Sequence, residues 1–348
     1  MPVDHSLNTE FPGPVNPGYH LKKENLKSVS EYANGILTGN RAMLAKAITL
    51  IESSKKEFHE LGNAILEKCY SNTGNSIRIG ITGVPGVGKS TFIEKFGMHL
   101  IDRGKKVAVL AIDPSSSLTK GSILGDKTRM QTLAAHENAF IRPTPAMGML
   151  GGVAGKTREV ILLCEAAGFD TIFVETVGVG QSEISVKNMV DFFLLLMLAG
   201  AGDELQGIKR GIMETADMII IHKSDGQNIE NAGLARHNYQ QALSLFPPHP
   251  SGWKTPVQTA SSIDNNGINE AWETITTYYD TVNKSGFFQK NRNQQLVNWL
   301  HDAIENELKT RFYNLPNIRK KLARFEREVL AGKLNPARAA TELIKLSQ

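Results

Sequence analysis

The sequence predicts an α/β protein, with a mostly parallel β-sheet, helices on both of its faces, and further helices at both ends of the chain. Two observations indicate this class. Short apolar runs of strand length alternate with segments whose apolar residues recur at the three- and four-residue steps of a helix. The chain has 348 residues, 41% hydrophobic and 21% charged, which suffices for one such domain with helical additions. The expected strands are residues 77–81, 106–112, the run ending at Glu175, 191–198, 217–221 and 256–258.

The loop after the first strand has the pattern G-x-x-x-x-G-K-[ST] and leads into a helix expected over 89–103. Its glycines permit backbone conformations in which successive N–H groups surround a phosphate, and the helix directs its N-terminal dipole at the same anion. Lys89 is the candidate catalytic residue because its ammonium would reach the β- and γ-phosphates, and the Ser90 hydroxyl would ligate Mg²⁺. The sequence therefore predicts a P-loop NTPase. The expected phosphate-binding residues are Gly83, Val84, Pro85, Gly86, Val87, Gly88, Lys89, Ser90 and Thr91.

Three carboxylates are candidates for the Mg²⁺ shell beside Ser90. Asp113 follows an expected strand, where doubly wound sheets place ligands, and it either binds the ion or caps the turn that follows. Asp126 lies in the glycine-hinged, charge-rich stretch 121–130, which is typical of a mobile switch. Glu175 ends a short apolar run and precedes a glycine loop, as in a Walker-B strand that leads into a γ-phosphate sensor.

Several loops are expected around the nucleotide. After Glu175, the Gly178 N–H would contact the γ-phosphate, and Gln181 would either orient the attacking water or serve as a polar switch residue. Residues 142–145 and 148–155 are expected to form a long irregular segment, and 200–210 a third mobile segment. No arginine finger is identifiable. The candidate charge donors, each also interpretable as a surface charge, are Arg129, Arg142, Arg158 and Lys209.

Residues 222–225 read His-Lys-Ser-Asp, which departs from the guanine-reading pattern Asn-Lys-x-Asp only in its first residue. The Asp225 carboxylate would accept hydrogen bonds from N1–H and the amino group of guanine, a donor pair that adenine lacks, while the Lys223 stem would lie across the base. Ala260 and Ser261 fit the final base-contacting turn. The alternative is a charged turn that closes a strand. These elements favour GTP over ATP, although the histidine replaces an asparagine that would tie neighbouring loops together.

Helices are expected on both sides of the nucleotide domain. Residues 28–70 predict two or three amphipathic helices, with breaks at Asn34-Gly35 and at 38–40. The C-terminal helices are expected at 267–282, 294–313, 317–331 and 336–346. One of them has an apolar stripe that the sheet cannot cover, which indicates a homodimer interface or, as the alternative, an intramolecular lid. The stripe consists of Leu296, Val297, Leu300, Ala303, Ile304 and Leu308.

The expected helices and strands divide the chain into four regions. The expected regions are a disordered tail (1–19), an N-terminal helical extension (20–72), the nucleotide domain (73–285) and a C-terminal helical dimerisation region (286–348).

The formal net charge of +4 is spread along the chain and gives no case for binding nucleic acid. The longest apolar run, 192–201, is about half of what a membrane span needs, and the tail has no apolar signal region, so a cytoplasmic protein is expected.

The two cysteines are not expected to form a disulfide or a metal site. Cys69 and Cys164 lie far apart in helix-like segments, without C-x-x-C spacing or a histidine at ligand spacing. We expect both to be reduced, buried thiols.

Five stretches together resemble the methylmalonyl-CoA mutase-associated GTPases of the MeaB/ArgK type. They are residues 83–90, 112–117, 122–130, 175–183 and 200–209, and the resemblance covers the chain from about 28 to 346. It implies a homodimeric G-protein chaperone of an adenosylcobalamin-dependent methylmalonyl-CoA mutase. Such a chaperone couples GTP binding and hydrolysis to cofactor loading, protection of the mutase and removal of damaged cofactor.

The same similarity assigns roles to individual residues. Mg²⁺ would be held by Ser90, Asp113, Asp126 and Glu175, and residues 200–209 would relay the presence of the mutase to the nucleotide. Two positions depart from the family pattern. His222 stands where asparagine is usual, which concerns guanine binding, and Ala199 stands where proline is common, which concerns the extra switch.

Other functions remain open from the sequence. A metal-insertion GTPase of the same class would carry a relay rich in histidine or cysteine, and the sequence has none. A kinase for a periplasmic amino-acid transport protein would need an acceptor site, for which no residue pattern stands out. A purely structural nucleotide-binding module would show no hydrolysis even with its partner.

Overall fold

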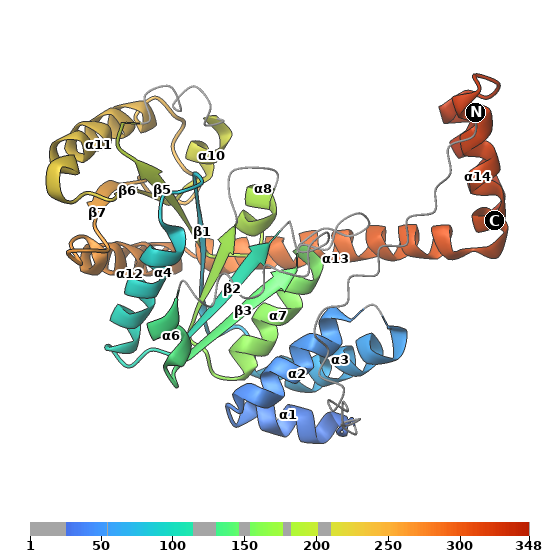
Figure 1. Ribbon diagram of the computed structural model, residues 1–348, viewed down its shortest axis with the longest axis horizontal. Helices are drawn as coiled ribbons and strands as arrows, with labels where there is room; N and C mark the ends of the chain where they lie inside the picture. Colours follow the sequence, from blue (N-terminus) through green and yellow to red (C-terminus); the bar gives the residue numbers. More distant parts are fainter. Residues whose placement is uncertain are drawn as a thin grey trace, which may run out of the picture.

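Seven parallel strands form one sheet in the order β3-β2-β4-β1-β5-β6-β7 (Figure 1). The structure is a computed structural model that describes residues 26–53, 55–113, 130–145, 154–176, 182–200 and 210–347. The predicted parallel α/β class is confirmed. The strands are β1 (Ile77–Gly83), β2 (Val107–Asp113), β3 (Ala139–Pro145), β4 (Thr171–Thr176), β5 (Phe192–Leu198), β6 (Met218–His222) and β7 (Val257–Ala260).

The central strand β1 pairs with β4 on one side and with β5 on the other, so that Ile81 lies beside both Glu175 and Leu194. Strands β4 and β6 are buried along their whole length, as expected for a parallel sheet covered on both faces. Because all strands run the same way, the loops that follow β1, β4, β5 and β6 meet at one edge of the sheet. This carboxyl edge carries the candidate site.

Strand β3 corrects one sequence prediction. Residues 142–145 were expected to be irregular, but they continue β3, with Pro143 opposite Ala111 of β2. A proline lacks the backbone N–H that a residue of a central strand donates to a neighbouring strand. Strand β3 pairs only with β2 and is the edge of the sheet, so Pro143 and Pro145 are tolerated there.

Helices cover both faces of the sheet. One apolar core lies between the sheet and α4, α6, α11 and α12, and the other lies between the opposite face and α7 and α8, with α1 to α3 packed behind (Figure 1). The helices are α1 (Val29–Leu37), α2 (Arg41–Glu52), α3 (Lys56–Cys69), α4 (Lys89–Ile101), α6 (Gln131–Ala135), α7 (Ala154–Ala166), α8 (Ser182–Lys187), α10 (Arg210–Thr215), α11 (Ile229–Leu243), α12 (Ile268–Lys284), α13 (Phe287–Asn314), α14 (Pro316–Leu330) and α15 (Pro336–Lys345).

Helices α1, α2 and α3 form a small bundle that packs on α7. The predicted break at 38–40 is confirmed, and the Asn40 side chain caps α2 by accepting hydrogen bonds from Ala42 N and Met43 N. The second expected break, at Asn34-Gly35, is wrong because both residues lie inside α1. Glycine is required at position 35 because α1 and α2 pack closely there, and a Cβ atom would come within 2.6 Å of Met43 Cγ.

The two cysteines agree with the sequence prediction. Cys69 ends α3, Cys164 lies in α7, and both are free thiols buried in the core. Burial raises the pKa of Cys164 well above the usual thiol range, so the side chain stays protonated and behaves as a small apolar group.

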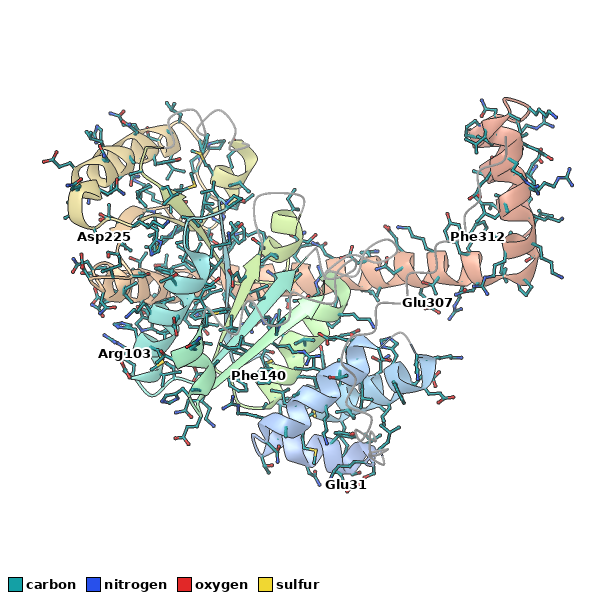
Figure 2. The ribbon with its side chains drawn as sticks, in the orientation of Figure 1. Glu31, Arg103, Phe140, Asp225, Glu307 and Phe312 are labelled. Carbon is teal, nitrogen blue, oxygen red and sulfur yellow. The ribbon has the colours of Figure 1, made fainter. Side chains whose placement is uncertain are left out.

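Helix α13 begins at Phe287, seven residues before the predicted start at 294, and carries the chain away from the body (Figure 1). Figure 2 labels Glu307 and Phe312 on the part of this helix that has left the sheet. Helices α14 and α15 pack together at its far end. We call α13 to α15 the arm. No helix in the described parts of the chain is long and apolar enough to cross a membrane.

The predicted apolar stripe on α13 is exposed to solvent. Leu296, Val297, Leu300, Ile304 and Leu308 have between 46% and 62% of their surface accessible. None of the described residues therefore covers this stripe as a lid would. Exposed apolar side chains that are continuous along a helix commonly mark a protein interface.

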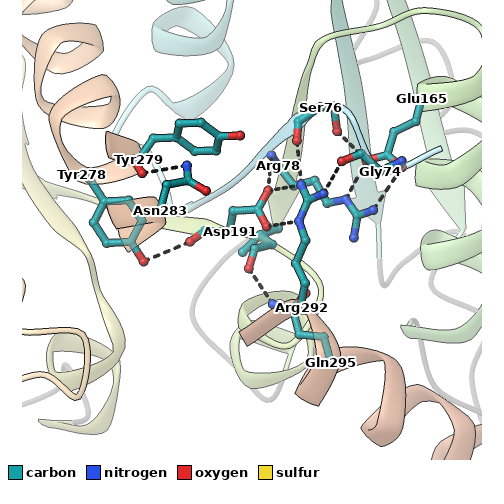
Figure 3. A network of polar contacts seen from close by, with 11 residues as sticks. Gly74, Ser76, Arg78, Glu165, Asp191, Tyr278, Tyr279, Asn283, Arg292 and Gln295 are labelled. Atoms are coloured by element: carbon teal, nitrogen blue, oxygen red, sulfur yellow. Dashed lines mark hydrogen bonds and ion pairs between the residues drawn. The ribbon is translucent and has the colours of Figure 1, made fainter. Parts of the chain in front are cut away.

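The root of the arm is held to the sheet by a buried polar network (Figure 3). Arg292 of α13 makes a bidentate ion pair with Asp191, through Nε to Oδ1 at 2.8 Å and Nη2 to Oδ2 at 2.7 Å. The same guanidinium donates to the carbonyl oxygens of Gly74 and Ser76, which lead into β1. Asp191 in turn accepts a bond from the Arg78 N–H, at 2.8 Å. The starts of β1, β5 and α13 are thus joined.

Candidate functional site

The phosphate loop runs from the end of β1 to the start of α4, as the sequence predicts. Gly83 approaches β5 so closely that a Cβ atom would lie 2.4 Å from the Leu196 carbonyl oxygen. Gly88, the N-cap of α4, has φ 93°, a left-handed conformation that favours glycine. These two positions therefore require glycine for reasons visible in the fold. The N-terminus of α4 opens on this loop, which is the arrangement that binds phosphate in other proteins.

Lys89 lies inside the loop rather than in solvent. Its side chain is buried, and Nζ donates to the Gly83 carbonyl at 2.9 Å and to the Val84 carbonyl at 3.5 Å. Burial lowers the pKa of the ammonium, while the negative charge of Glu175 opposes that shift. The amine is consequently held at the loop by two carbonyl oxygens and needs little rearrangement to meet an anion there.

Ser90 and Glu175, two of the four predicted Mg²⁺ ligands, are brought together. The Ser90 hydroxyl donates to Glu175 Oε1 at 3.3 Å, and the Glu175 carboxylate is buried at the end of β4. A hydroxyl and a carboxylate oxygen are ligand types that Mg²⁺ prefers. Asp113 ends β2, the strand beside β4, so its backbone lies at the same edge of the sheet.

The other predicted residues on the γ-phosphate side fall outside the described parts of the chain. These residues are Asp126, Gly178 and Gln181, and the side chain of Asp113 is likewise outside them. Among the described side chains, no group of three or more histidines, cysteines, aspartates and glutamates is arranged to hold a metal ion.

The predicted base end also comes together beside the phosphate loop. Ser261 Oγ donates to Asp225 Oδ2 at 2.8 Å, and Ser224 N donates to the Ala260 carbonyl at 3.1 Å. The Lys223 ammonium donates to the Gly86 carbonyl at 2.8 Å. The segment that would read the base is therefore tied directly to the loop that would hold the phosphates.

His222 joins the same two loops. Its Nδ1 lies 2.7 Å from the Val87 carbonyl oxygen and its Nε2 lies 2.7 Å from Ser262 Oγ. The sequence flagged His222 as a departure from the asparagine pattern but gave no sign of Ser262. That partner is 40 residues away and becomes a neighbour only through the pairing of β6 with β7.

Two of the candidate charge donors have other partners in the structure. Arg142 of β3 forms an ion pair with Glu52 of α2. Arg158 of α7 forms one with Asp302 of α13, at 2.9 Å between Nη1 and Oδ2. Both guanidinium groups bind neighbouring helices. The other two candidates, Arg129 and Lys209, lie outside the described residues.

A parallel sheet, a phosphate loop with a buried lysine and a guanine-type base segment define a P-loop NTPase of the GTPase kind. Residues 44–317 match a protein-family model that is described as "Methylmalonyl Co-A mutase-associated GTPase MeaB". The chain belongs to this family and is a GTPase, which confirms the resemblance derived from the five stretches.

Individual relatives agree with this assignment. The chain is 49% identical over 284 residues to the GTPase ArgK of Escherichia coli, covering 82% of this chain and 86% of the relative. It is 43% identical over 335 residues to the mitochondrial methylmalonic aciduria type A homolog of Mus musculus, covering 93% and 81%. A solved structure described as an LAO/AO transport system kinase superimposes with a TM-score of 0.72 at 38% identity, covering 93% and 99%.

Proposed function

We propose that this GTPase is a chaperone of an adenosylcobalamin-dependent methylmalonyl-CoA mutase, and that GTP binding and hydrolysis gate cofactor loading, protection and reactivation of that enzyme. The observation that carries the proposal is the match of residues 44–317 to a family described as mutase-associated. The relative from Mus musculus supports it, because its name refers to methylmalonic aciduria.

In the proposed site, the chain positions GTP and neutralises charge while water attacks the γ-phosphorus in line and GDP leaves. Lys89 and the amides of residues 83–91 bind the phosphates. The Gly178 N–H contacts the γ-phosphate, and Gln181 orients the water. Lys223, Asp225, Ala260 and Ser261 bind the guanine.

Mg²⁺ fits the residues that the fold brings together, because the Ser90 hydroxyl and the Glu175 carboxylate are oxygen ligands 3.3 Å apart. We propose that Ser90 and Glu175, with Asp113 and Asp126, hold this ion. When bound, it would offset negative charge on the phosphates.

The test is GTP hydrolysis by the purified full-length protein, with and without the adenosylcobalamin mutase of the same cell. We expect activity on GTP but not on ATP, and a several-fold increase in rate when the mutase is added, because a partner that orders the switch segments completes the site. An unchanged rate on adding the mutase would reject the mutase assignment and leave a GTPase with another partner.

The kinase alternative has a specific observation in its favour, the superposition on a solved protein described as a transport system kinase. It is tested in the same preparation by adding a periplasmic amino-acid-binding protein and γ-labelled nucleotide. Label transferred to that protein would support the kinase and contradict the chaperone proposal. Label released only as inorganic phosphate would support hydrolysis.

We further propose that the arm forms a homodimer through the apolar stripe of α13. The double substitution Leu300→Glu and Ile304→Glu is expected to convert a dimer to a monomer. Both positions are exposed on the stripe, and each new glutamate would bring a negative charge into the apolar interface. Analytical ultracentrifugation measures the mass. The matched control is Lys309→Glu, which lies roughly opposite the stripe at 3.6 residues per turn and should leave the dimer intact. A monomeric wild-type protein would contradict the proposal.

A further inference from the structure

His222 occupies the point where the two halves of the nucleotide site meet. It is the last residue of β6, between Leu198 of β5 and Ala260 of β7, and only 2% of its surface is exposed. Lys223 and Asp225 follow it directly along the chain. The imidazole therefore lies beneath the carboxyl edge of the sheet rather than in the solvent-exposed part of the site.

The ring is fixed by packing as well as by hydrogen bonds. The Phe92 ring of α4 meets it edge to face, with 5.7 Å between centroids and an interplanar angle of 86°. A Cβ atom at Gly88 would come within 3.0 Å of His222 Cε1, so the phosphate loop closes directly over the imidazole. These contacts hold the ring with Nδ1 towards Val87 and Nε2 towards Ser262.

The hydrogen-bond partners determine the protonation state. A carbonyl oxygen only accepts, so Nδ1 carries the proton and donates to Val87 O. Burial lowers the pKa of His222, and the nearby Lys223 charge lowers it further, against the opposing effects of the Val87 hydrogen bond and Asp225. The neutral ring then leaves Nε2 to accept from the buried Ser262 hydroxyl. An asparagine amide offers the same two functions, one N–H donor and one oxygen acceptor.

Both partners belong to loops that we assign to the nucleotide. Val87 lies in the phosphate loop, and Ser262 follows Ser261, whose hydroxyl donates to the base-reading Asp225. On the basis of the proposed guanine-nucleotide site, we infer that His222 is a positioning residue that holds the phosphate loop and the base loop in register as the neutral Nδ1–H tautomer. It acts through these loops and does not touch the reacting atoms. Its loss weakens nucleotide binding much more than it slows the chemical step.

The experiment compares His222→Ala, His222→Asn and Ser262→Ala with the wild-type protein. Fluorescent GDP and GTP analogues give the Kd, steady-state hydrolysis gives KM and kcat, and circular dichroism checks folding. We expect His222→Ala to raise Kd and KM roughly tenfold or more, because both hydrogen bonds that pass through the ring are lost, while kcat changes less than about threefold. His222→Asn should bind within about threefold of wild type. His237→Ala, an exposed histidine on α11, is the matched control.

Each result decides the inference. Nitrogen-15 NMR of the imidazole should report Nδ1 as the protonated nitrogen, and an Nε2–H tautomer would overturn the assignment. Wild-type affinity in His222→Ala would overturn the positioning role, and so would equally weak binding by His222→Asn. If His222→Ala does not fold, Ser262→Ala takes its place, and wild-type affinity there would overturn the link. A wild-type protein that binds no guanine nucleotide would instead overturn the proposed site and this inference with it.

Discussion

Replacing Lys89 by alanine is expected to abolish measurable GTP hydrolysis, with a loss of at least about 10²-fold in kcat/KM. Lys89 is buried at the phosphate loop, with Nζ 2.9 Å from the Gly83 carbonyl. Without it, negative charge on the transferring phosphoryl group would lose its nearest side-chain partner. Initial rates of phosphate release, measured over a range of GTP concentrations with Mg²⁺ present, check this prediction.

The same substitution is not expected to unfold the protein. Burial already penalises the Lys89 ammonium and lowers its pKa, so its removal relieves a desolvation cost in the nucleotide-free state. Thermal unfolding of Lys89→Ala should therefore match that of wild type within a few degrees. Lys95→Ala, on the exposed side of the same helix, controls for the loss of a lysine. Near-normal hydrolysis by Lys89→Ala would show that the loop is not the catalytic site.

Arg292→Leu is expected to lower the free energy of unfolding by about 3–5 kcal/mol, the range for breaking a buried ion pair by removing one partner. Asp191 is only 3% exposed, and without Arg292 its negative charge would remain buried, with no other ion pair among the described residues. The carbonyl oxygens of Gly74 and Ser76 would lose a donor at the same time. Urea unfolding followed by circular dichroism measures the change.

Two variants distinguish the ion pair from a general effect on the arm. Arg311→Leu removes an arginine from the same helix, but that side chain is 75% exposed and pairs with Glu307 on the surface, so a change below about 0.5 kcal/mol is expected. Adding Asp191→Asn to Arg292→Leu removes the buried charge and should recover part of the lost stability. A loss below about 1 kcal/mol in Arg292→Leu would contradict the role given to this pair.

The sequence was sufficient for six of the seven strands, all but β3, and for much of the site, because both depend on local patterns. Apolar runs of strand length identify the parallel strands, and the spacing of Gly83, Gly88 and Lys89 identifies a phosphate loop without knowledge of its neighbours. The order of the strands places Ser90 beside Glu175 and Ser261 beside Asp225. These juxtapositions were expected from the motifs, since parallel strands end at one edge.

The features that sequence reasoning missed depend on contacts between distant residues. Arg292 and Asp191 are 101 residues apart, and neither differs in sequence from an ordinary surface charge. The predicted start of α13 was late because its first two turns show no helical apolar stripe. Phe287 and Phe288 pack against the core, but the buried side chain that follows them is the polar Arg292. The edge position of β3, which makes room for Pro143, likewise emerges only from the assembled sheet.

The length of α13 has a mechanical consequence. Its 28 residues span about 42 Å at 1.5 Å per residue. A rotation of about 10° at the root would move the far end by roughly 7 Å, so the helix converts small angles into large displacements. A partner protein that binds α14 and α15 would in turn constrain the angle of α13 at its root. There, Arg292 joins the helix to the start of β1, which leads to the phosphate loop, and to the start of β5, which leads to Gly200. The arm would therefore act as a lever, with its fixed end at Arg292 in the GTPase fold and its free end at α14 and α15.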